Sequence, residues 1–270
     1  MNEAPPLPAS LTQVAPARWR AVRGVLTDID DTLTRHGAIE PAAREALRQL
    51  SVAGVPVIAI TGRPMGWSEP FVRDGTLPAI VAENGAVALF REGDALRVEF
   101  AQDQATRHAN RARLQQVATR IVREVPGATI SPDSVGRATD IAFDHSEFVH
   151  LDSPSIDRVV AIMHAEGLNA TVSSIHINGW LGSHTKFTGA QWAVRRLLGG
   201  ELEREIEHWV YVGDSTNDQA MFARFPLSVG VANLMHFAAQ LTVWPAYLTC
   251  GERGAGFAEV ADALLAARAG

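Results

Sequence analysis

The sequence contains little of what marks secreted or membrane proteins. It has a single cysteine, Cys250, so no intramolecular disulfide can form, which suits a reducing compartment. No apolar run approaches the roughly 18 residues that a membrane-spanning helix needs. The N-terminal residues lack both the basic start and the continuous apolar stretch of a signal peptide. These absences predict a cytoplasmic protein that does not bind a membrane.

The charge pattern argues against one further class of partner. The formal net charge is −6, and no Lys/Arg-rich run overrides it, so nothing favours nucleic-acid binding. With 47% hydrophobic and 20% charged residues, the composition is that of an ordinary globular protein. A chain of 270 residues is long enough for one large domain or for a domain with an insert. The Pro/Ala-rich residues 1–20 are expected to form a flexible tail.

Short β-branched segments alternate with segments of helical periodicity toward both ends of the chain. Strands are expected within 22–31 and over 55–60, 79–82, 208–212 and 227–231, and helices over 41–53, 187–197 and 257–264. Apolar strands that alternate with helices predict a parallel sheet covered by helices on both faces. The predicted fold class is therefore α/β, with a Rossmann-like doubly wound core.

The middle of the chain follows a different pattern. Helices are expected over 103–125 and 156–165, and strand-like stretches occur before residue 145 and over 169–180. These pieces predict a small α/β unit, an inserted cap, over residues 89–182. The core would then consist of residues 21–88 and 183–270.

Three polar segments follow three of the predicted strands. They are Asp28-Ile29-Asp30-Asp31-Thr32, Thr61-Gly62-Arg63 and Gly213-Asp214-Ser215-Thr216-Asn217-Asp218. Each segment taken alone is equally consistent with a turn or a helix cap. In a parallel sheet, however, all three meet at the carboxyl edge, where open α/β sheets bind ligands. Their coincidence predicts a functional site.

The order of these segments resembles the haloacid dehalogenase superfamily, in particular its Cof-type (subfamily IIB) phosphatases with an inserted α/β cap. The resemblance spans nearly all of the chain after residue 20. Its motifs match Asp28–Thr32, Thr61, Lys186 and Gly213–Asp218, while Glu83–Ala86 resembles the segment that leads into the cap. Many members have glycine at the position of Asp31, although versions with Asp-Asp-Thr also occur, so the resemblance fixes the nucleophile but not the loop geometry near Asp31.

The resemblance implies a phosphatase that works through an aspartyl-phosphate on Asp28, with Asp30 as the general acid and base. Thr61 and Lys186 would complete the phosphate cradle. The second aspartate favours phosphate chemistry over dehalogenation, because a halide leaves without needing a proton. The resemblance also implies Mg²⁺, held by the Asp28 carboxylate, the Asp30 carbonyl and the Asp214 side chain, with Asp218 as a ligand or support.

The sequence indicates the substrate-binding residues less clearly than the catalytic ones. The candidates are Arg63, Asn84, Arg137, Asp140, His176 and Asn178. His176, Asn178 and Trp180 share one face of a predicted strand, which could form a wall above the site or an exposed outer surface. The resemblance favours a small phosphorylated metabolite, in particular a sugar phosphate. A phosphomutase using the same intermediate and a catalytically silent metabolite-binding protein both remain open, and the sequence does not indicate an oligomeric state.

Overall fold

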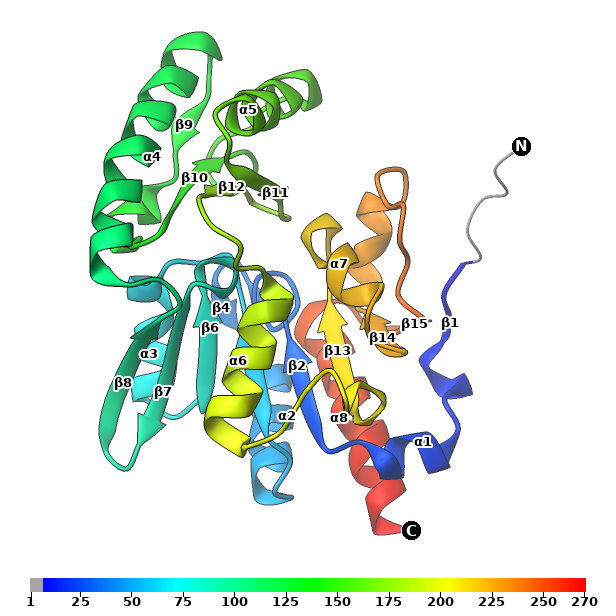
Figure 1. Ribbon diagram of the computed structural model, residues 1–270. Helices are drawn as coiled ribbons and strands as arrows, with labels where there is room; N and C mark the ends of the chain where they lie inside the picture. Colours follow the sequence, from blue (N-terminus) through cyan, green and yellow to red (C-terminus); the bar gives the residue numbers. More distant parts are fainter. Residues whose placement is uncertain (1–6) are drawn as a thin grey trace.

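The computed structural model describes residues 7–270 and is built around one large sheet (Figure 1). Nine strands lie in the order β1-β15-β14-β13-β2-β5-β6-β7-β8. Their bounds are β1 (Ala9–Ser10), β2 (Gly24–Thr27), β5 (Val57–Ile60), β6 (Ala79–Ala82), β7 (Val87–Glu92), β8 (Ala95–Phe100), β13 (Trp209–Gly213), β14 (Leu227–Gly230) and β15 (Tyr247–Leu248). Neighbours from β1 to β6 pair in parallel, whereas β7 and β8 add an antiparallel hairpin.

The chain winds in opposite directions from the middle of this sheet. From β2 it proceeds outward through β5 and β6, and from β13 it proceeds the other way through β14 and β15. The neighbours β2 and β13 pair in register from Trp209 opposite Gly24 to Val212 opposite Thr27. Such a switch point leaves a crevice at the carboxyl ends of the two strands, where the connections diverge.

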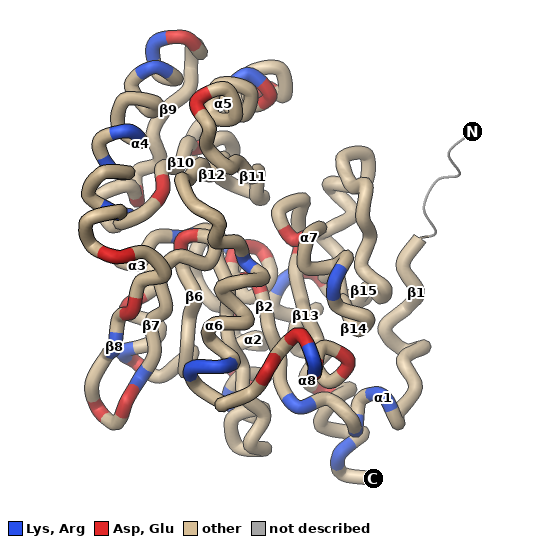
Figure 2. Tube along the Cα trace, viewed as in Figure 1, with Lys and Arg blue, Asp and Glu red and all other residues tan. Residues whose placement is uncertain are grey.

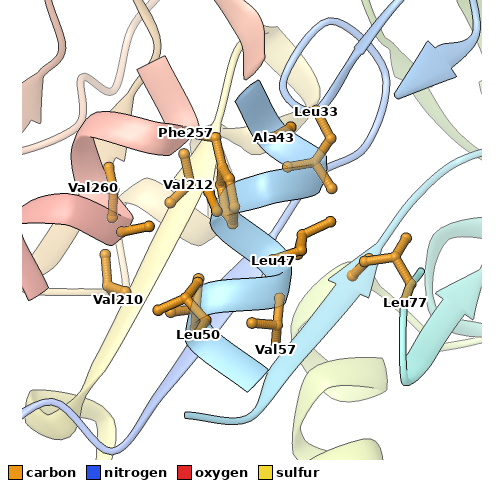
Figure 3. Close-up of a cluster of buried hydrophobic side chains, with 14 of the residues drawn as sticks. Leu33, Ala43, Leu47, Leu50, Val57, Leu77, Val210, Val212, Phe257 and Val260 are labelled. Carbon is orange, nitrogen blue, oxygen red and sulfur yellow. The ribbon is translucent and has the colours of Figure 1, made fainter. Parts of the chain in front are cut away.

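Helices cover both faces of the sheet, as the apolar strands predict (Figure 1). The helices are α1 (Pro16–Ala21), α2 (Pro41–Val52), α3 (Met65–Arg73), α6 (Lys186–Leu198), α7 (Gln219–Phe222) and α8 (Arg253–Ala269). Figure 3 shows Leu50 of α2 and Phe257 of α8 on the side of Val210 and Val212, and Leu47 of α2 on the side of Leu77, all in one buried cluster. These side chains are buried because they recur on one face of each helix, which faces the sheet.

A second, four-stranded sheet lies above the carboxyl edge of the first (Figure 1). Its order is β11-β12-β10-β9, with β9 (Thr129–Ile130), β10 (Asp140–Asp144), β11 (Asn169–Val172) and β12 (His176–Trp180). The helices α4 (Gln104–Glu124) and α5 (Ser153–Ala165) bury one face of it around Phe143 and Ile177. The opposite face, which carries alternate residues of β10 and β12, is left for contact with the core.

Short elements complete the fold. The two-stranded hairpin consists of β3 (Thr34–Arg35) and β4 (Ala38–Ile39), and the 3-10 turns are η1 (Leu11–Gln13), η2 (Glu83–Gly85), η3 (Pro132–Gly136), η4 (Ile206–His208), η5 (Thr216–Asp218) and η6 (Ala232–Phe237). Within residues 7–270, no helix combines the length and the apolar character that crossing a membrane requires.

The predicted start of the insert at residue 89 differs from the sheet topology. Residues 87–100 form β7 and β8 of the main sheet, because the chain reverses at Asn84 and Gly85, both at positive φ, and pairs back along β6. The second sheet and its helices fall within residues 104–180. The spacing of apolar residues predicts a strand but does not say which sheet it joins, since pairing is a tertiary contact.

The predicted flexible tail over residues 1–20 is also wrong for the part that the structure describes. There the chain pairs β1 with β15 and packs α1 against α8, and it buries Leu11, Val14 and Trp19. The Pro/Ala-rich composition suggested a tail because the apolar residues within it are widely spaced. Pro16 is compatible with a helix, since it occupies the first turn of α1, where proline is tolerated. Residues 1–6 lie outside the described part of the chain.

Candidate active site

Three buried carboxylates meet where β2 and β13 end. Asp28 follows β2 and donates its backbone N–H to the carbonyl of Val212, so the strand pairing continues up to the acid. Asp214 follows β13, and Asp218 closes the turn η5 four residues later. One carboxylate oxygen from each lies within 4.8 Å of the others. Figure 2 shows acidic segments gathered between the two sheets, close to the upper end of β2.

Lys186 is inserted into this cluster. Its Nζ lies 2.7 Å from Oδ1 of Asp28 and 2.8 Å from Oδ1 of Asp218, and the side chain is buried. Burial alone would lower the pKa of Lys186, but Asp218 and Asp28 outweigh it and raise the pKa above its ordinary value. It is the sole lysine among 24 Lys and Arg residues. A compact ammonium suits this position between two carboxylates better than a forked guanidinium.

The start of α6 brings Lys186 to the cluster. Thr185 caps the helix through a reciprocal pair of hydrogen bonds with Thr188. The first turn of the helix passes close to the turn after β6. A Cβ added at Gly189 would lie only 2.6 Å from the Cα of Gly85. Glycine at both positions therefore permits the approach that carries Lys186 inward.

Asp218 has its acceptor positions filled by the protein. Oδ1 accepts hydrogen bonds from Lys186 and from the hydroxyl of Tyr211, and Oδ2 accepts the backbone N–H groups of Asp214 and Ser215. An ionised carboxylate has about four lone-pair sites. Asp218 therefore holds Lys186 and shapes the Asp214 loop, and it has little capacity left to coordinate an ion directly.

Asp214 is the opposite case. It is fully buried, yet its oxygens receive only long contacts, 3.5 Å from the hydroxyl of Thr32 and 3.4 Å from the amide of Asn233. Burial, followed by the nearby charges of Asp28 and Asp218, raises the pKa of Asp214 well above its ordinary value. A buried carboxylate with weak partners and two carboxylate neighbours fits a bound cation with oxygen ligands.

Asp28 is likewise a buried carboxylate whose ionised form is disfavoured. Burial raises its pKa to about 8, although Lys186 acts in the other direction. A cation close to Asp214 and Asp28 would stabilise the ionised form of both carboxylates. The donor set, which consists of carboxylates without cysteine or histidine, is the one that Mg²⁺ and similar hard cations prefer.

Asp30 is not part of this cluster and is held by an arginine. Both of its oxygens accept Nε of Arg63, at 3.0 and 3.1 Å. Burial raises the pKa of Asp30, and the charge of Arg63 offsets only part of that effect. The guanidinium of Arg63 also forms a two-pronged pair with Glu147, at 2.7 and 3.0 Å. Glu147 follows β10, so this pair connects the core to the second sheet.

A cavity of about 320 Å³ opens beside Asp30, between the core and the second sheet. Its walls come from the core segments that follow β2, β5 and β15 and from turns at the near edge of the second sheet. The lining residues are Asp30, Asp31, Thr34, His36, Gly37, Arg63, Ser146, Glu147, Phe148, Ser174, Ile175 and Arg253. A volume of this size is at the lower end of the range for small-molecule sites.

The structure places the catalytic candidates near one edge of the sheet but in different surroundings. Asp28, Asp214, Asp218 and Lys186 form the acidic cluster. Thr61 directly follows β5, which lies next to β2, and its hydroxyl accepts the N–H of Arg63.

The residues proposed for substrate binding are mostly used in contacts between the two sheets. Asn178 and Arg137 both donate to the carbonyl of Gly62, and both also bind the carboxylate of Asp140. Arg137 precedes β10 instead of lying on it. His176 and Asn178 share one face of β12, as their spacing predicts, and both side chains are buried, so this face is not the exposed outer surface that the sequence left open. Of the six candidates, only Arg63 lines the cavity.

The remaining candidate, Asn84, has a different environment. It lies in η2 at φ 55° and donates its backbone N–H to the carbonyl of Thr61. Its side-chain Nδ2 is buried and has no hydrogen-bond partner among the described residues 7–270. A Cβ on Gly62 would lie 3.4 Å from that amide, so Asn84 packs directly beneath the loop that follows β5.

Several residues of the site were not found from the sequence. Glu147 and Phe148 lie in the turn after β10, far along the chain from the motifs, and no local pattern marks them. Asn233 follows β14, and its amide supports Asp214 and the carbonyl of Asp31. Of these residues, only Asn233 could have been found from the sequence, because it is a polar residue just beyond a predicted buried strand.

The comparison with family models decides the relationship. The model of the haloacid dehalogenase-like hydrolase family matches residues 25–158, a range that includes Asp28, Asp30 and Thr61. The chain belongs to the haloacid dehalogenase-like hydrolases. The α/β fold agrees with this assignment, and the comparison with curated proteins gives no match.

Solved structures share the fold of this hydrolase at low sequence identity. A Thermoplasma acidophilum protein aligns with a TM-score of 0.68 and 16% identity, over 90% of this chain and 98% of that one. The sucrose-phosphatase of Synechocystis, solved with sucrose and phosphate, gives a TM-score of 0.64 and 16% identity, over 90% and 98%. The C-terminal domain of Candida albicans trehalose-6-phosphate phosphatase gives 0.66 and 15%, over 97% and 99%.

Proposed function

We propose that this hydrolase is a Mg²⁺-dependent phosphatase that cleaves the phosphate monoester of a small metabolite through an aspartyl-phosphate on Asp28. The observation that carries the proposal is the placement of two acids two residues apart. Asp28 lies in the buried carboxylate cluster with Lys186, whereas Asp30 lines the adjacent cavity. The nucleophile needs positive charge beside it, and the proton donor needs to border the space that the leaving group occupies.

In the first half-reaction, a carboxylate oxygen of Asp28 attacks phosphorus and forms an acyl phosphate. The bond between phosphorus and the leaving oxygen breaks, and protonated Asp30 gives its proton to that oxygen. Burial, which raises the pKa of Asp30, favours the protonated acid that this step requires. Lys186 offsets the negative charge where carboxylate and phosphate approach each other.

In the second half-reaction, Asp30 is a carboxylate and accepts a proton from a water molecule. That water attacks phosphorus, the acyl phosphate bond breaks, and Asp28 is regenerated together with inorganic phosphate. Arg63 holds Asp30 through Nε, so we assign it to positioning the acid instead of binding the phosphate. Water replaces the departed alcohol in the cavity next to Asp30.

Asp214 and Asp28 would hold Mg²⁺, with the Asp30 carbonyl as a further ligand and Asp218 as the support that orders the loop. The ion would neutralise charge on the phosphate and bring it into line with Asp28. The weakly partnered Asp214 supports this assignment. Thr61 would complete the phosphate cradle at the end of β5.

We further propose that the second sheet and its helices, over about residues 101–182, act as the cap over this site. Arg137, Asp140 and Asn178 would dock the cap on the loop after β5, because they bind the Gly62 carbonyl and one another. A sugar phosphate is the substrate class that the fold neighbours suggest, since they include a sucrose-phosphatase and a trehalose-6-phosphate phosphatase.

The test compares the purified protein with Asp28→Asn and with Asp157→Asn, an exposed carboxylate on α5 that serves as the control. Phosphate release from p-nitrophenyl phosphate should need Mg²⁺ and should fall at least about a thousandfold in Asp28→Asn, because the nucleophile is lost. The control should match the parent. Retention of more than about a tenth of the rate by Asp28→Asn would exclude its covalent role.

A second assay separates the phosphatase from a phosphomutase, which would use the same intermediate. The protein is incubated with a hexose 1-phosphate, and both free phosphate and isomeric esters are measured. Release of free phosphate supports the proposal. An isomeric ester without phosphate release would show a mutase, and absence of turnover of every ester would favour a silent binding protein.

A further inference from the structure

The cavity beside Asp30 is where the leaving group must lie if the proposed function holds, because Asp30 protonates the leaving oxygen. One wall comes from the core, through Asp31, His36 and Arg253, and the other comes from two turns of the cap. The first cap turn follows β10 and carries Glu147 and Phe148. The second connects β11 to β12. The chemistry of these walls therefore bears on which leaving group the site accepts.

The cap turn after β10 is held in a defined shape. The buried carboxylate of Asp144 accepts the backbone N–H groups of Ser146, Glu147 and Phe148, at 3.1, 2.9 and 2.9 Å. The hydroxyl of Ser146 donates to the carbonyl of Ser174, which joins the two cap turns. Glu147 and Phe148 thus face the cavity from a fixed backbone, and Phe148 is 72% exposed.

Every arginine in the cavity wall already has carboxylate partners. Arg63 binds Asp30 through Nε and Glu147 through its two terminal nitrogens. Arg253 binds Asp31 at 2.7 Å and Glu252 at 2.9 Å. Among residues 7–270, which the structure describes, the only other titratable side chain that could be cationic on this wall is His36, at the exposed tip of the β3–β4 hairpin.

The uncharged groups of the wall suit hydroxyls and an apolar surface. The hydroxyl of Ser174 is buried and has no hydrogen-bond partner in the described part of the chain, although its residue lines the cavity. A ligand hydroxyl could satisfy it, and the exposed ring of Phe148 could cover an apolar ligand face. A carboxylate or a second phosphate would instead lie against Asp31 and Glu147, and no unpaired arginine would receive it.

We infer that this site selects phosphate esters whose leaving group is uncharged and hydroxylated, and that it rejects leaving groups that carry a carboxylate or a second phosphate. The paired arginines supply no attraction for an added anion, and the wall carboxylates repel it. Burial would raise the pKa of Glu147, but the hydrogen bonds from His176 and Arg63 lower it to about 2, so Glu147 carries its charge at neutral pH.

The experiment compares two esters that differ by one group. Glycerol 3-phosphate and 3-phosphoglycerate have the same three-carbon length, and a hydroxymethyl group in the first replaces a carboxylate in the second. We expect kcat/KM to be at least about tenfold higher for glycerol 3-phosphate. p-Nitrophenyl phosphate reports whether the chemical step is intact.

A variant tests the cause of the selectivity. Glu147→Gln removes one negative charge from the wall and one partner from Arg63, so the preference for glycerol 3-phosphate should shrink by about tenfold. The ratio of the two kcat/KM values is unaffected by any loss common to both esters. Asp157→Asn removes a charge from the exposed side of the cap and should leave the ratio unchanged.

The outcomes are distinct. Equal or faster hydrolysis of 3-phosphoglycerate by the parent protein would overturn the inference while leaving the phosphatase proposal intact. An unchanged ratio in Glu147→Gln would likewise refute the role of the wall charge. Failure to hydrolyse any ester, p-nitrophenyl phosphate included, would overturn the proposed function itself, and the inference with it.

Discussion

Glu83 joins the core to the segment that enters the second sheet, and it should give the protein a pH-dependent stability. The residue directly follows β6, and its side chain is fully buried. Oε2 accepts the backbone N–H and the hydroxyl of Thr139, each at 2.6 Å, while Oε1 accepts the N–H groups of Met65 and Ala138, at 3.2 and 3.0 Å. One carboxylate thus connects the start of α3 to the chain that enters β10.

The environment of Glu83 disfavours its charge. Burial and the nearby Asp140 raise its pKa, hydrogen bonds from Thr139 and Ala138 lower it, and the balance moves the pKa from 4.5 to about 7. The folded state therefore binds this proton more tightly than the unfolded chain does. The stability that Glu83 contributes is fully present below about pH 4.5 and is lost as the pH rises through about 7. The difference corresponds to about 3 kcal/mol, at about 1.4 kcal/mol for each pH unit.

Glu83→Gln removes the titration. The amide puts a donor against backbone N–H groups, so the variant should be less stable by about 1–3 kcal/mol at low pH. Between pH 4.5 and about 8, however, the unfolding free energy of the parent should fall by about 3 kcal/mol relative to that of the variant. Urea unfolding at a series of pH values measures both, with Glu203→Gln on the surface as the control.

The decisive quantity is how the difference in unfolding free energy between the parent and Glu83→Gln changes with pH. Parent and Glu203→Gln should give parallel curves, since Glu203 is exposed. Parallel curves for the parent and Glu83→Gln would refute the reasoning, because they would show that Glu83 titrates alike in the folded and unfolded states. A stability advantage of the parent over Glu83→Gln that grows with rising pH would contradict the sign of the shift.

Two further predictions concern the carboxylate cluster. Lys186→Met should lower the unfolding free energy by about 3–5 kcal/mol in the presence of a chelator, because it leaves Asp28 and Asp218 buried without their cation. Urea unfolding measures this loss. A loss below about 1 kcal/mol would show that the contacts of Lys186 with these carboxylates are not needed for folding. Asp214→Asn should raise the Mg²⁺ concentration that gives half-maximal phosphate release by at least about tenfold, with Asp157→Asn as the control, and an unchanged requirement would remove Asp214 from the metal site.

The sequence alone was sufficient for the α/β class and for the acids that follow β2 and β13. Asp28 and Asp30 are adjacent to the strand that delivers them, so their placement depends on local pattern: a buried apolar run, then a polar turn. The same reasoning predicted α2, α4, α5 and α6 near their observed bounds, because the helical period is a local property. Lys186 was found through its motif, although periodicity gave no reason for it to turn inward.

Only the tertiary structure decided which charges are paired and which are free. The contact between Arg63 and Glu147 joins residues 84 positions apart, and it changes Arg63 from an expected substrate contact into the group that holds Asp30. The addition of β7 and β8 to the main sheet and the packing of α1 on α8 are likewise pairings between elements. A residue's spacing determines which face it occupies, but its partner depends on how distant segments pack, and in this protein those partners determine the charge of the cavity wall.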